Sequence, residues 1–170
     1  IQHFEGMSKE IVDFRAKTHE EPLWTNSMFG GMPAFQISTY FNGNLTRYVN
    51  KVLTGFFPDC SGFVFMACLG FFLLLIVLEV NPWLAIAGGL AYGLSSYNLI
   101  ILEAGHNTKM NALAAVPYVA AGVMLIWKKT YVLGFAASAL AFSVLITANH
   151  VQIAFYTMMS FIILFIILFA

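Results

Sequence analysis

Charged residues are scarce in this chain: Asp, Glu, Lys and Arg make up 9% of its 170 residues. Residues 61–170 contain only Glu79, Glu103, Lys109, Lys128 and Lys129. Hydrophobic residues make up 60% of the chain, against about 45–50% in a soluble domain. We therefore expect an integral membrane protein whose first partner is the lipid bilayer. Polar groups in its apolar part should lie at a membrane surface or serve a function.

Net positive charge and cysteine patterns are also missing. Eight basic and eight acidic residues cancel, so the chain offers no electrostatic attraction for nucleic acid. Cys60 and Cys68 form neither a CxxC pair nor a metal-ligand spacing. Cys68 falls in an apolar stretch and is predicted to pack there. The composition excludes a disulfide framework and a nucleic-acid-binding domain.

Long apolar runs are what the chain does have. Each is about long enough to cross the ~30 Å hydrocarbon core as a helix. The predicted spans are 62–80, 82–102, 112–127, 131–147 and 151–170. They form an all-α, polytopic transmembrane bundle over residues 61–170. We also expect at least one helix before Ile1 and more after Ala170.

Two features inside the predicted spans concern helix packing. Ala85, Gly89 and Gly93 recur at every fourth residue, a small-residue face that lets another helix approach closely. Pro117 falls inside the third span and predicts a kink.

Residues 1–60 are mixed in polarity and predict two amphipathic helices. One carries Phe4, Met7, Ile11 and Phe14 on a single face. The other runs over 45–57, with Asn44 as its N-cap. The acidic residues of the first helix are interpreted as a solvated face. We favour a subdomain lying on the bilayer surface over a small soluble domain, because 60 residues make a poor independent core.

Five crossings would sort the loops between two membrane faces. Residues 1–60, 103–111 and 147–152 would share one face, and the turns at 81–82 and 128–129 the other. The positive-inside rule does not decide the orientation, because Lys128 and Lys129 oppose Arg47 and Lys51.

The segment 103–109 is the sharpest candidate site. Glu103 and His106 lie three residues apart, so they share a helical face or a tight turn. They are predicted to bind a divalent cation or to act as acid and base. Lys109 and Asn107 follow, and a lysine can meet a phosphate as a point charge. The alternative is a capped, hydrated loop between two helices.

Two further polar groups are candidate substrate-binding residues. His150 lies in the next loop on the same predicted face. Trp24, Asn26, Gly30 and Gly31 belong to a turn whose aromatic and amide groups suit stacking on a sugar. The alternatives are a helix-end hydrogen bond for His150 and a packed surface turn for the Trp24 segment.

Three strings carry a family resemblance: EPLWTNSMFGGMP at 21–33, GHNTKM at 105–110 and ITANH at 146–150. The chain resembles the YfhO family of bacterial polytopic membrane proteins over its whole length. That family is similar to GT-C glycosyltransferases. The resemblance implies a bacterial cytoplasmic membrane protein with residues 1–60 as an extracytoplasmic loop and Lys128–Lys129 inside.

The resemblance also implies an activity. Such enzymes transfer a sugar from a polyprenyl-phosphate donor to a cell-envelope glycan or glycopolymer acceptor. Glu103 and His106 would serve the phosphate or a Mg or Mn ion. The main acidic base is expected upstream of Ile1.

Two other functions stay open. A flippase or transporter of lipid-linked glycans needs polar groups at mid-membrane depth. Those available are Ser95, Ser96, Asn98, Ser138 and Ser143. The third hypothesis is a non-catalytic membrane scaffold.

Overall fold

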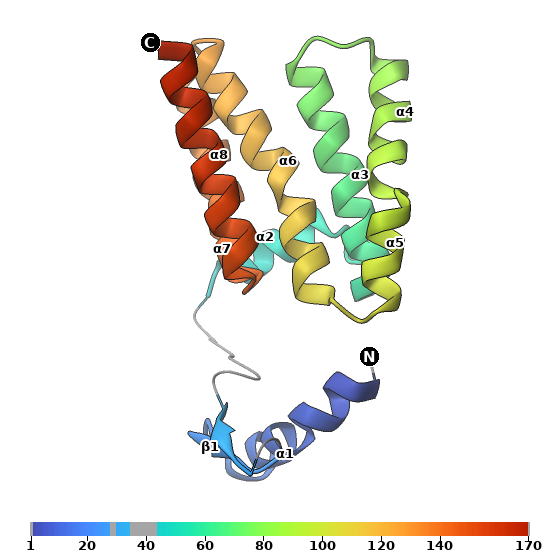
Figure 1. Ribbon diagram of the computed structural model, residues 1–170, viewed down its shortest axis with the longest axis vertical. Helices are drawn as coiled ribbons and strands as arrows, with labels where there is room; N and C mark the ends of the chain where they lie inside the picture. Colours follow the sequence, from blue (N-terminus) through green and yellow to red (C-terminus); the bar gives the residue numbers. More distant parts are fainter. Residues whose placement is uncertain (1, 28–29, 35–43, 170) are drawn as a thin grey trace. The chain divides into compact units, whose positions relative to one another are not determined.

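The chain is mostly helical, as its composition predicts. The computed structural model describes residues 2–27, 30–34 and 44–169, and it divides at Asn44 into two compact units (Figure 1). The helix α2, which the sequence groups with residues 1–60, belongs to the second unit because it packs against α7.

The first unit is one helix with a short hairpin. It contains α1 (Gln2–Thr18), β1 (Trp24–Thr25) and β2 (Met32–Pro33). The strands are antiparallel, with Trp24 opposite Pro33 and Thr25 opposite Met32. Ile11 is buried as its helical face predicts, whereas Phe14 is 40% exposed. The side chains of Phe4 and Met7 lie outside the described part of the chain.

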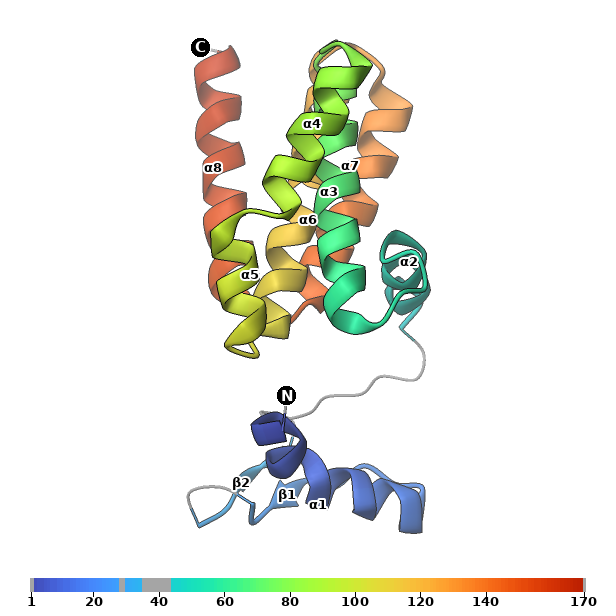
Figure 2. The same cartoon turned by 90° about the vertical axis from the view of Figure 1, so that its right-hand side faces the viewer.

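The second unit is a helical bundle. Its elements are α2 (Thr46–Leu53), α3 (Asp59–Val77), α4 (Pro82–Gly93), α5 (Ser96–Glu103), α6 (Asn107–Trp127), α7 (Tyr131–Thr147) and α8 (Val151–Phe169). α6 packs against both α3 and α7, and α4 packs against α3. Figure 2 shows α2 beside α3 and α7 at one end of this bundle.

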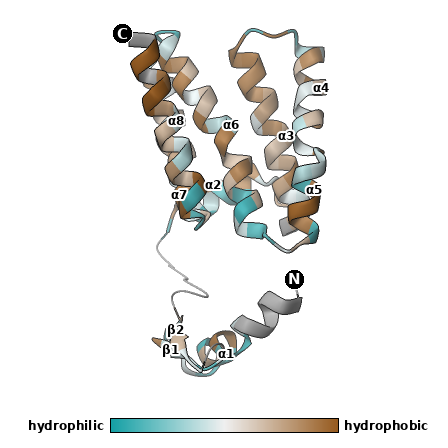
Figure 3. Cartoon of the chain, viewed as in Figure 1, coloured by the Kyte–Doolittle hydropathy of each residue, from teal (hydrophilic) through white to brown (hydrophobic). Residues whose placement is uncertain are grey.

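The bundle is built for a bilayer. Three segments are long and apolar enough to cross one: Cys60–Val77, Pro82–Glu103 and Asn107–Trp127. α7 and α8 are shorter apolar helices. Figure 3 shows apolar residues along the helices and polar ones gathered at the bundle's ends. The chain is therefore a multi-pass membrane protein, and five crossings remain a prediction.

The small-residue face of α4 works as predicted. Ala85, Gly89 and Gly93 are all buried. A methyl group added to Gly89 would lie 2.6 Å from the carbonyl oxygen of Cys68 on α3. The backbones of α3 and α4 therefore approach more closely here than any side chain would permit.

The second predicted span, 82–102, matches the candidate span Pro82–Glu103, but two helices form it rather than one. α4 ends at Gly93 and α5 begins at Ser96. The buried Asn98 donates through Nδ2 to the carbonyl oxygens of Tyr92, at 2.8 Å, and Gly93, at 3.5 Å. The Tyr92 carbonyl also accepts from the backbone N–H of Ser95 at 3.3 Å. Asn98 thus adds a shorter hydrogen bond at the end of α4, in a hydrocarbon setting where bulk water cannot serve as the donor.

Pro117 lies within α6, which continues through it. Proline has no N–H, so the carbonyl of Leu113, four residues earlier, loses its helical donor. The hydroxyl of Tyr92 donates to that oxygen at 3.1 Å. One side chain on α4 therefore replaces the hydrogen bond that Pro117 cannot make.

This compensation predicts a non-additive pair of substitutions. Tyr92→Phe should destabilise the protein by about 0.6–2 kcal/mol, the range for hydrogen bonds between membrane helices. The same change in a Pro117→Ala background should cost clearly less, because the alanine would supply the missing N–H. Equilibrium unfolding of the four proteins in bicelles gives the coupling energy. Equal losses in both backgrounds would contradict the compensation.

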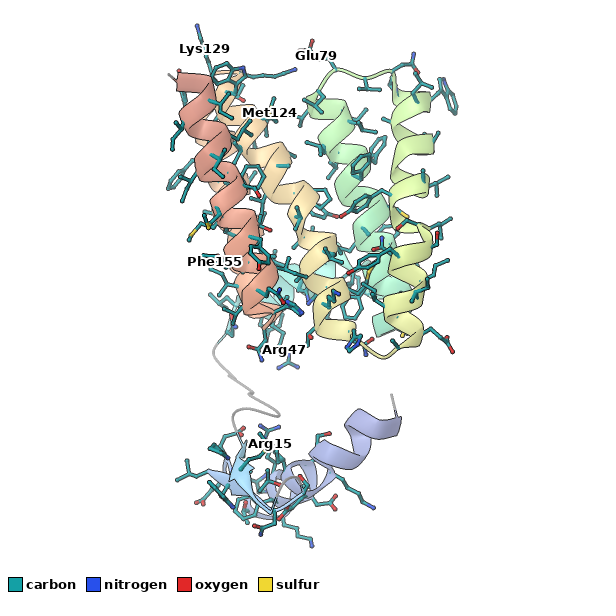
Figure 4. The ribbon with its side chains drawn as sticks, viewed as in Figure 1. Arg15, Arg47, Glu79, Met124, Lys129 and Phe155 are labelled. Atoms are coloured by element: carbon teal, nitrogen blue, oxygen red, sulfur yellow. The ribbon has the colours of Figure 1, made fainter. Side chains whose placement is uncertain are left out.

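The bundle end that carries Glu79 and Lys129 is closed by two tight turns (Figure 4). Lys128 Nζ lies 2.6 Å from Glu79 Oε1 and joins the α3–α4 turn to the α6–α7 turn. The hydrogen bond from Lys128 and its positive charge lower the pKa of the Glu79 carboxyl below its usual range. Arg47, on α2, lies at the opposite end of the bundle.

Candidate functional site

Glu103 is the last residue of α5 and His106 is the N-cap of α6, so the two flank the tight turn that joins these helices. Gly105 has a φ of +77°. The N–H of Gly105 donates to the carbonyl of Leu102 and that of His106 to the carbonyl of Ile101, each at 2.9 Å. This is a Schellman turn, which ends a helix and reverses the chain.

The turn changes where the polar residues of 103–111 lie. The sequence predicts a polar connector up to Asn111, but α6 begins at Asn107. Glu103 and His106 are exposed on the turn, whereas Asn107 and Lys109 are half-buried in the first turn of α6. The ammonium of Lys109 lies 5.2 Å from the centre of the Tyr97 ring on α5.

His150 lies at the same end of the bundle as that turn. A methyl group on Gly122 would meet Ser138 of α7, and one on Gly134 would meet Ile126 of α6. The two contacts define one antiparallel register between α6 and α7. Continued to the end of the hairpin, that register brings His150 to the level of Met110 and Asn111. The predicted association of His150 with the 103–109 segment is consistent with this register.

Asn107 and Asn111 are partly buried on α6. They lie four residues apart and, by helical periodicity, on the same side of α6 as Tyr118. The hydroxyl of Tyr118 donates to the carbonyl of Met66 on α3 at 3.0 Å. Because α3 and α6 run in the same direction (Figure 1), Asn111 lies near the level of the first turns of α3.

α2 brings a third asparagine to this end. A methyl group on Gly62, in α3, would lie 3.0 Å from Cβ of Thr54, just after α2. Asn50 is one helical turn before Thr54. Val49 and Leu53, on either side of Asn50, pack against the buried core of the bundle.

Within the described residues, four buried polar atoms at this end have no hydrogen-bond partner: Oδ1 of Asn50, Asn107 and Asn111, and Nδ1 of His150. We call these four residues the amide–imidazole cluster. Each unmet group costs about 1–3 kcal/mol, so a native protein keeps such groups for a reason. Amide oxygens accept hydrogen bonds, and an unprotonated imidazole nitrogen does so too. The cluster is suited to hydroxyl groups or ordered water.

Sequence reasoning identified half of this cluster. Asn107 and His150 were predicted from their loops, whereas Asn50 and Asn111 were not. The spacing of Asn107 and Asn111, four residues apart, is a signal that could have found Asn111. Asn50 comes from a separate helix, and no local pattern marks it.

The Trp24 segment forms a compact turn in the first unit. The indole Nε1 of Trp24 donates to Asn26 Oδ1 at 3.3 Å. A methyl group on Gly31 would lie 2.5 Å from that nitrogen, so only glycine lets the indole lie against the backbone. Gly30 and Gly31 both have positive φ, at +76° and +119°. The structure brings Trp24, Asn26 and Gly31 together as predicted.

Glu10 is exposed, as its interpretation as part of a solvated helix face predicts, and it also holds this turn in place. Its Oε2 accepts from the hydroxyl of Thr25 at 2.5 Å and from the N–H of Asn26 at 2.9 Å. A pocket of about 280 Å³ lies beside the turn. Its lining is Glu10, Ile11, Phe14, Pro22, Leu23 and Trp24. The exposed indole and the Glu10 carboxylate beside it suit a sugar.

The structure offers few side chains that could bind a divalent cation. In the described ranges, no three His, Cys, Asp or Glu side chains gather around one point. Glu103 and His106 are suitable ligand types on one turn, so a cation there would need further oxygen ligands from a substrate or water.

The Trp24 turn and the amide–imidazole cluster belong to different units of the chain. Their association on one membrane face remains a prediction. Comparison of the chain with protein-family models, curated proteins and solved structures finds no match in any of the three.

Proposed function

We propose that the chain is part of a membrane glycosyltransferase. It would transfer a sugar from a polyprenyl-phosphate donor to a cell-envelope glycan or glycopolymer outside the cytoplasm of a bacterium. The observation that carries the proposal is the polar end of the bundle. There the α5–α6 turn exposes Glu103 and His106, Lys109 follows, and the amide–imidazole cluster offers unused acceptors. The resemblance of the three sequence strings to the YfhO family supports the same function.

In this mechanism each polar group has a role. The bond between the sugar's anomeric carbon and the phosphate oxygen breaks as the acceptor hydroxyl bonds to that carbon. A carboxylate base takes the hydroxyl proton. Lys109 and His106 stabilise the charge on the departing polyprenyl phosphate. A Mg or Mn ion held by Glu103 and His106 would add further charge neutralisation.

The remaining candidates bind rather than react. Asn107 and His150, with the rest of the amide–imidazole cluster, accept hydrogen bonds from sugar hydroxyls. Trp24 stacks on the sugar or the acceptor, and Asn26 with the Gly30–Gly31 turn fixes the indole. In this proposal the polar end of the bundle is extracytoplasmic and Lys128–Lys129 is cytoplasmic.

Substitution of the α5–α6 turn tests the proposal. The variants Glu103→Gln and His106→Ala of the full-length protein in proteoliposomes should transfer labelled sugar from a polyprenyl-phosphate donor about 10²-fold more slowly. Glu79→Gln is the control, because Glu79 is also an exposed carboxylate and lies at the other end of the bundle. Unchanged transfer in both turn variants would remove Glu103 and His106 from the mechanism.

One observation favours a second function, the flipping of lipid-linked glycans. The break between α4 and α5 resembles the discontinuous helices on which transporters build binding sites. However, Asn98 already occupies the carbonyls of Tyr92 and Gly93. Translocation of a fluorescent lipid-linked glycan by proteoliposomes, without transfer of its sugar, would favour the flippase.

A further inference from the structure

Lys109 has an aromatic neighbour that the proposed mechanism does not use. Its ammonium lies 5.2 Å from the centre of the Tyr97 ring, within the ~6 Å range of a cation–π interaction. The two residues come from different helices, α5 and α6, on either side of the Glu103–His106 turn. The Tyr97 ring therefore restricts the position of the flexible Lys109 side chain beside the predicted phosphate site.

The position of Tyr97 is itself determined by the break between α4 and α5. Tyr97 is the second residue of α5 and is 52% exposed. The next residue, Asn98, is 4% exposed and hydrogen-bonds to the end of α4. Asn98 thereby fixes the start of α5, and its neighbour Tyr97 is presented on the outer side of that helix.

The contact with the Tyr97 ring leaves the Lys109 ammonium able to bind an anion. An aromatic ring attracts the cation through its face without neutralising its charge. A carboxylate partner would instead compete with a phosphate for Lys109. Among the described residues, no ion pair of Lys109 shorter than 4.0 Å is found. The positive charge of the Lys109 ammonium is therefore available to a phosphate.

We propose that Tyr97 is a positioning residue for Lys109, holding its ammonium where it binds the phosphate of a polyprenyl phosphate. This inference rests on the proposed function for its ligand, although the Tyr97–Lys109 contact does not. Asn98 supports the arrangement by anchoring α5. Neither Tyr97 nor Asn98 touches the reacting atoms in this proposal.

Binding of undecaprenyl phosphate to the full-length protein in nanodiscs tests the ligand. Undecaprenol, which lacks the phosphate, is the reference probe. Tyr97→Leu should weaken undecaprenyl phosphate binding about two- to fivefold, and Tyr97→Phe should leave it near the wild-type value. In a Lys109→Met background, Tyr97→Leu should not weaken binding further. If Tyr97 had only a general structural role, Tyr97→Leu would weaken binding in that background too.

A second measurement tests the contact without a ligand. The rate at which a water-soluble amine-acetylating reagent modifies Lys109 can be followed by peptide mass spectrometry. It should rise in Tyr97→Leu and not in Tyr97→Phe, with Lys51 in α2 as the internal reference.

The outcomes separate the two ideas. If Lys109→Met leaves undecaprenyl phosphate binding unchanged, the phosphate role of Lys109 fails, and with it this part of the proposed function. If binding depends on Lys109 but Tyr97→Leu changes neither binding nor the acetylation rate, the positioning role of Tyr97 is overturned and the proposed function stands.

Discussion

Gly89→Ala should destabilise the bundle by about 1–3 kcal/mol, the usual cost of overpacking a core. The added methyl would lie 2.6 Å from the carbonyl oxygen of Cys68 and 3.2 Å from Cβ of Phe72. The nearest of these atoms belongs to the backbone of α3, so no rotamer change can relieve the clash. α3 and α4 would have to move apart, and the close packing along Ala85, Gly89 and Gly93 would be lost.

The adjacent glycine provides a matched control. A methyl on Gly88 would lie 2.5 Å from Cδ1 of Leu75, with Phe71 ring atoms at 3.6 Å and beyond. Leu75 Cδ1 is the end of a flexible side chain and can move. Gly88→Ala should therefore be neutral, or stabilising by up to about 1 kcal/mol through helix propensity. Unfolding of both variants in bicelles compares them directly. If both substitutions change the free energy of unfolding equally, Gly89 is not required for the close approach of α3 and α4.

Much of the bundle could be predicted because membrane-spanning helices are marked by the hydropathy of their own residues. α7 was predicted at 131–147 and occupies Tyr131–Thr147. The small-residue face of α4 was readable because a spacing of four residues is a local pattern. Helix ends were harder to predict. Hydropathy places the start of α6 too late, since the polar residues Asn107, Lys109 and Asn111 look like loop although they form its first turns.

The break between α4 and α5 could not be read from hydropathy. Leu94 and the residues around it are apolar or small, so the segment scores as one span. The break depends on which carbonyls Asn98 reaches in three dimensions, and hydropathy carries no information about hydrogen bonds. The sequence did identify Asn98 as polar at mid-depth, and the structure assigns it a partner within its own chain segment.

The candidate site shows the same division between local and distant information. Glu103 and His106 were found because a single turn contains both. The exposure of Glu10 was predicted but its hydrogen bonds were not, because its partners, Thr25 and Asn26, lie 15 and 16 residues further along the chain. Asn50 joins the amide–imidazole cluster only because α2 packs beside α3 and α7. Pairings between distant segments are decided by packing, which no window of sequence displays.

Asn98→Leu should be the most damaging single substitution on α5. The leucine fits an apolar setting, but it donates no hydrogen bond to the carbonyls of Tyr92 and Gly93. The Tyr92 carbonyl would keep only the longer bond from the backbone N–H of Ser95, at 3.3 Å. A lost hydrogen bond between groups in a membrane costs about 0.6–2 kcal/mol, and no water within the hydrocarbon core can replace the amide. The bond to Tyr92, at 2.8 Å, should account for most of the loss because the one to Gly93, at 3.5 Å, is long.

The effect should extend beyond stability, because Asn98 anchors the helix that leads to the α5–α6 turn. In Asn98→Leu, a cysteine placed at position 103 should react with a water-soluble maleimide at a changed rate. A cysteine at position 79, at the other end of the bundle, should react as before. Ser96→Ala is the control substitution, since Ser96 is exposed at the start of α5 and forms no hydrogen bond through its side chain in the described structure. If Asn98→Leu and Ser96→Ala unfold alike, the backbone N–H of Ser95 is a sufficient donor at the end of α4, and Asn98 does not set the direction of α5.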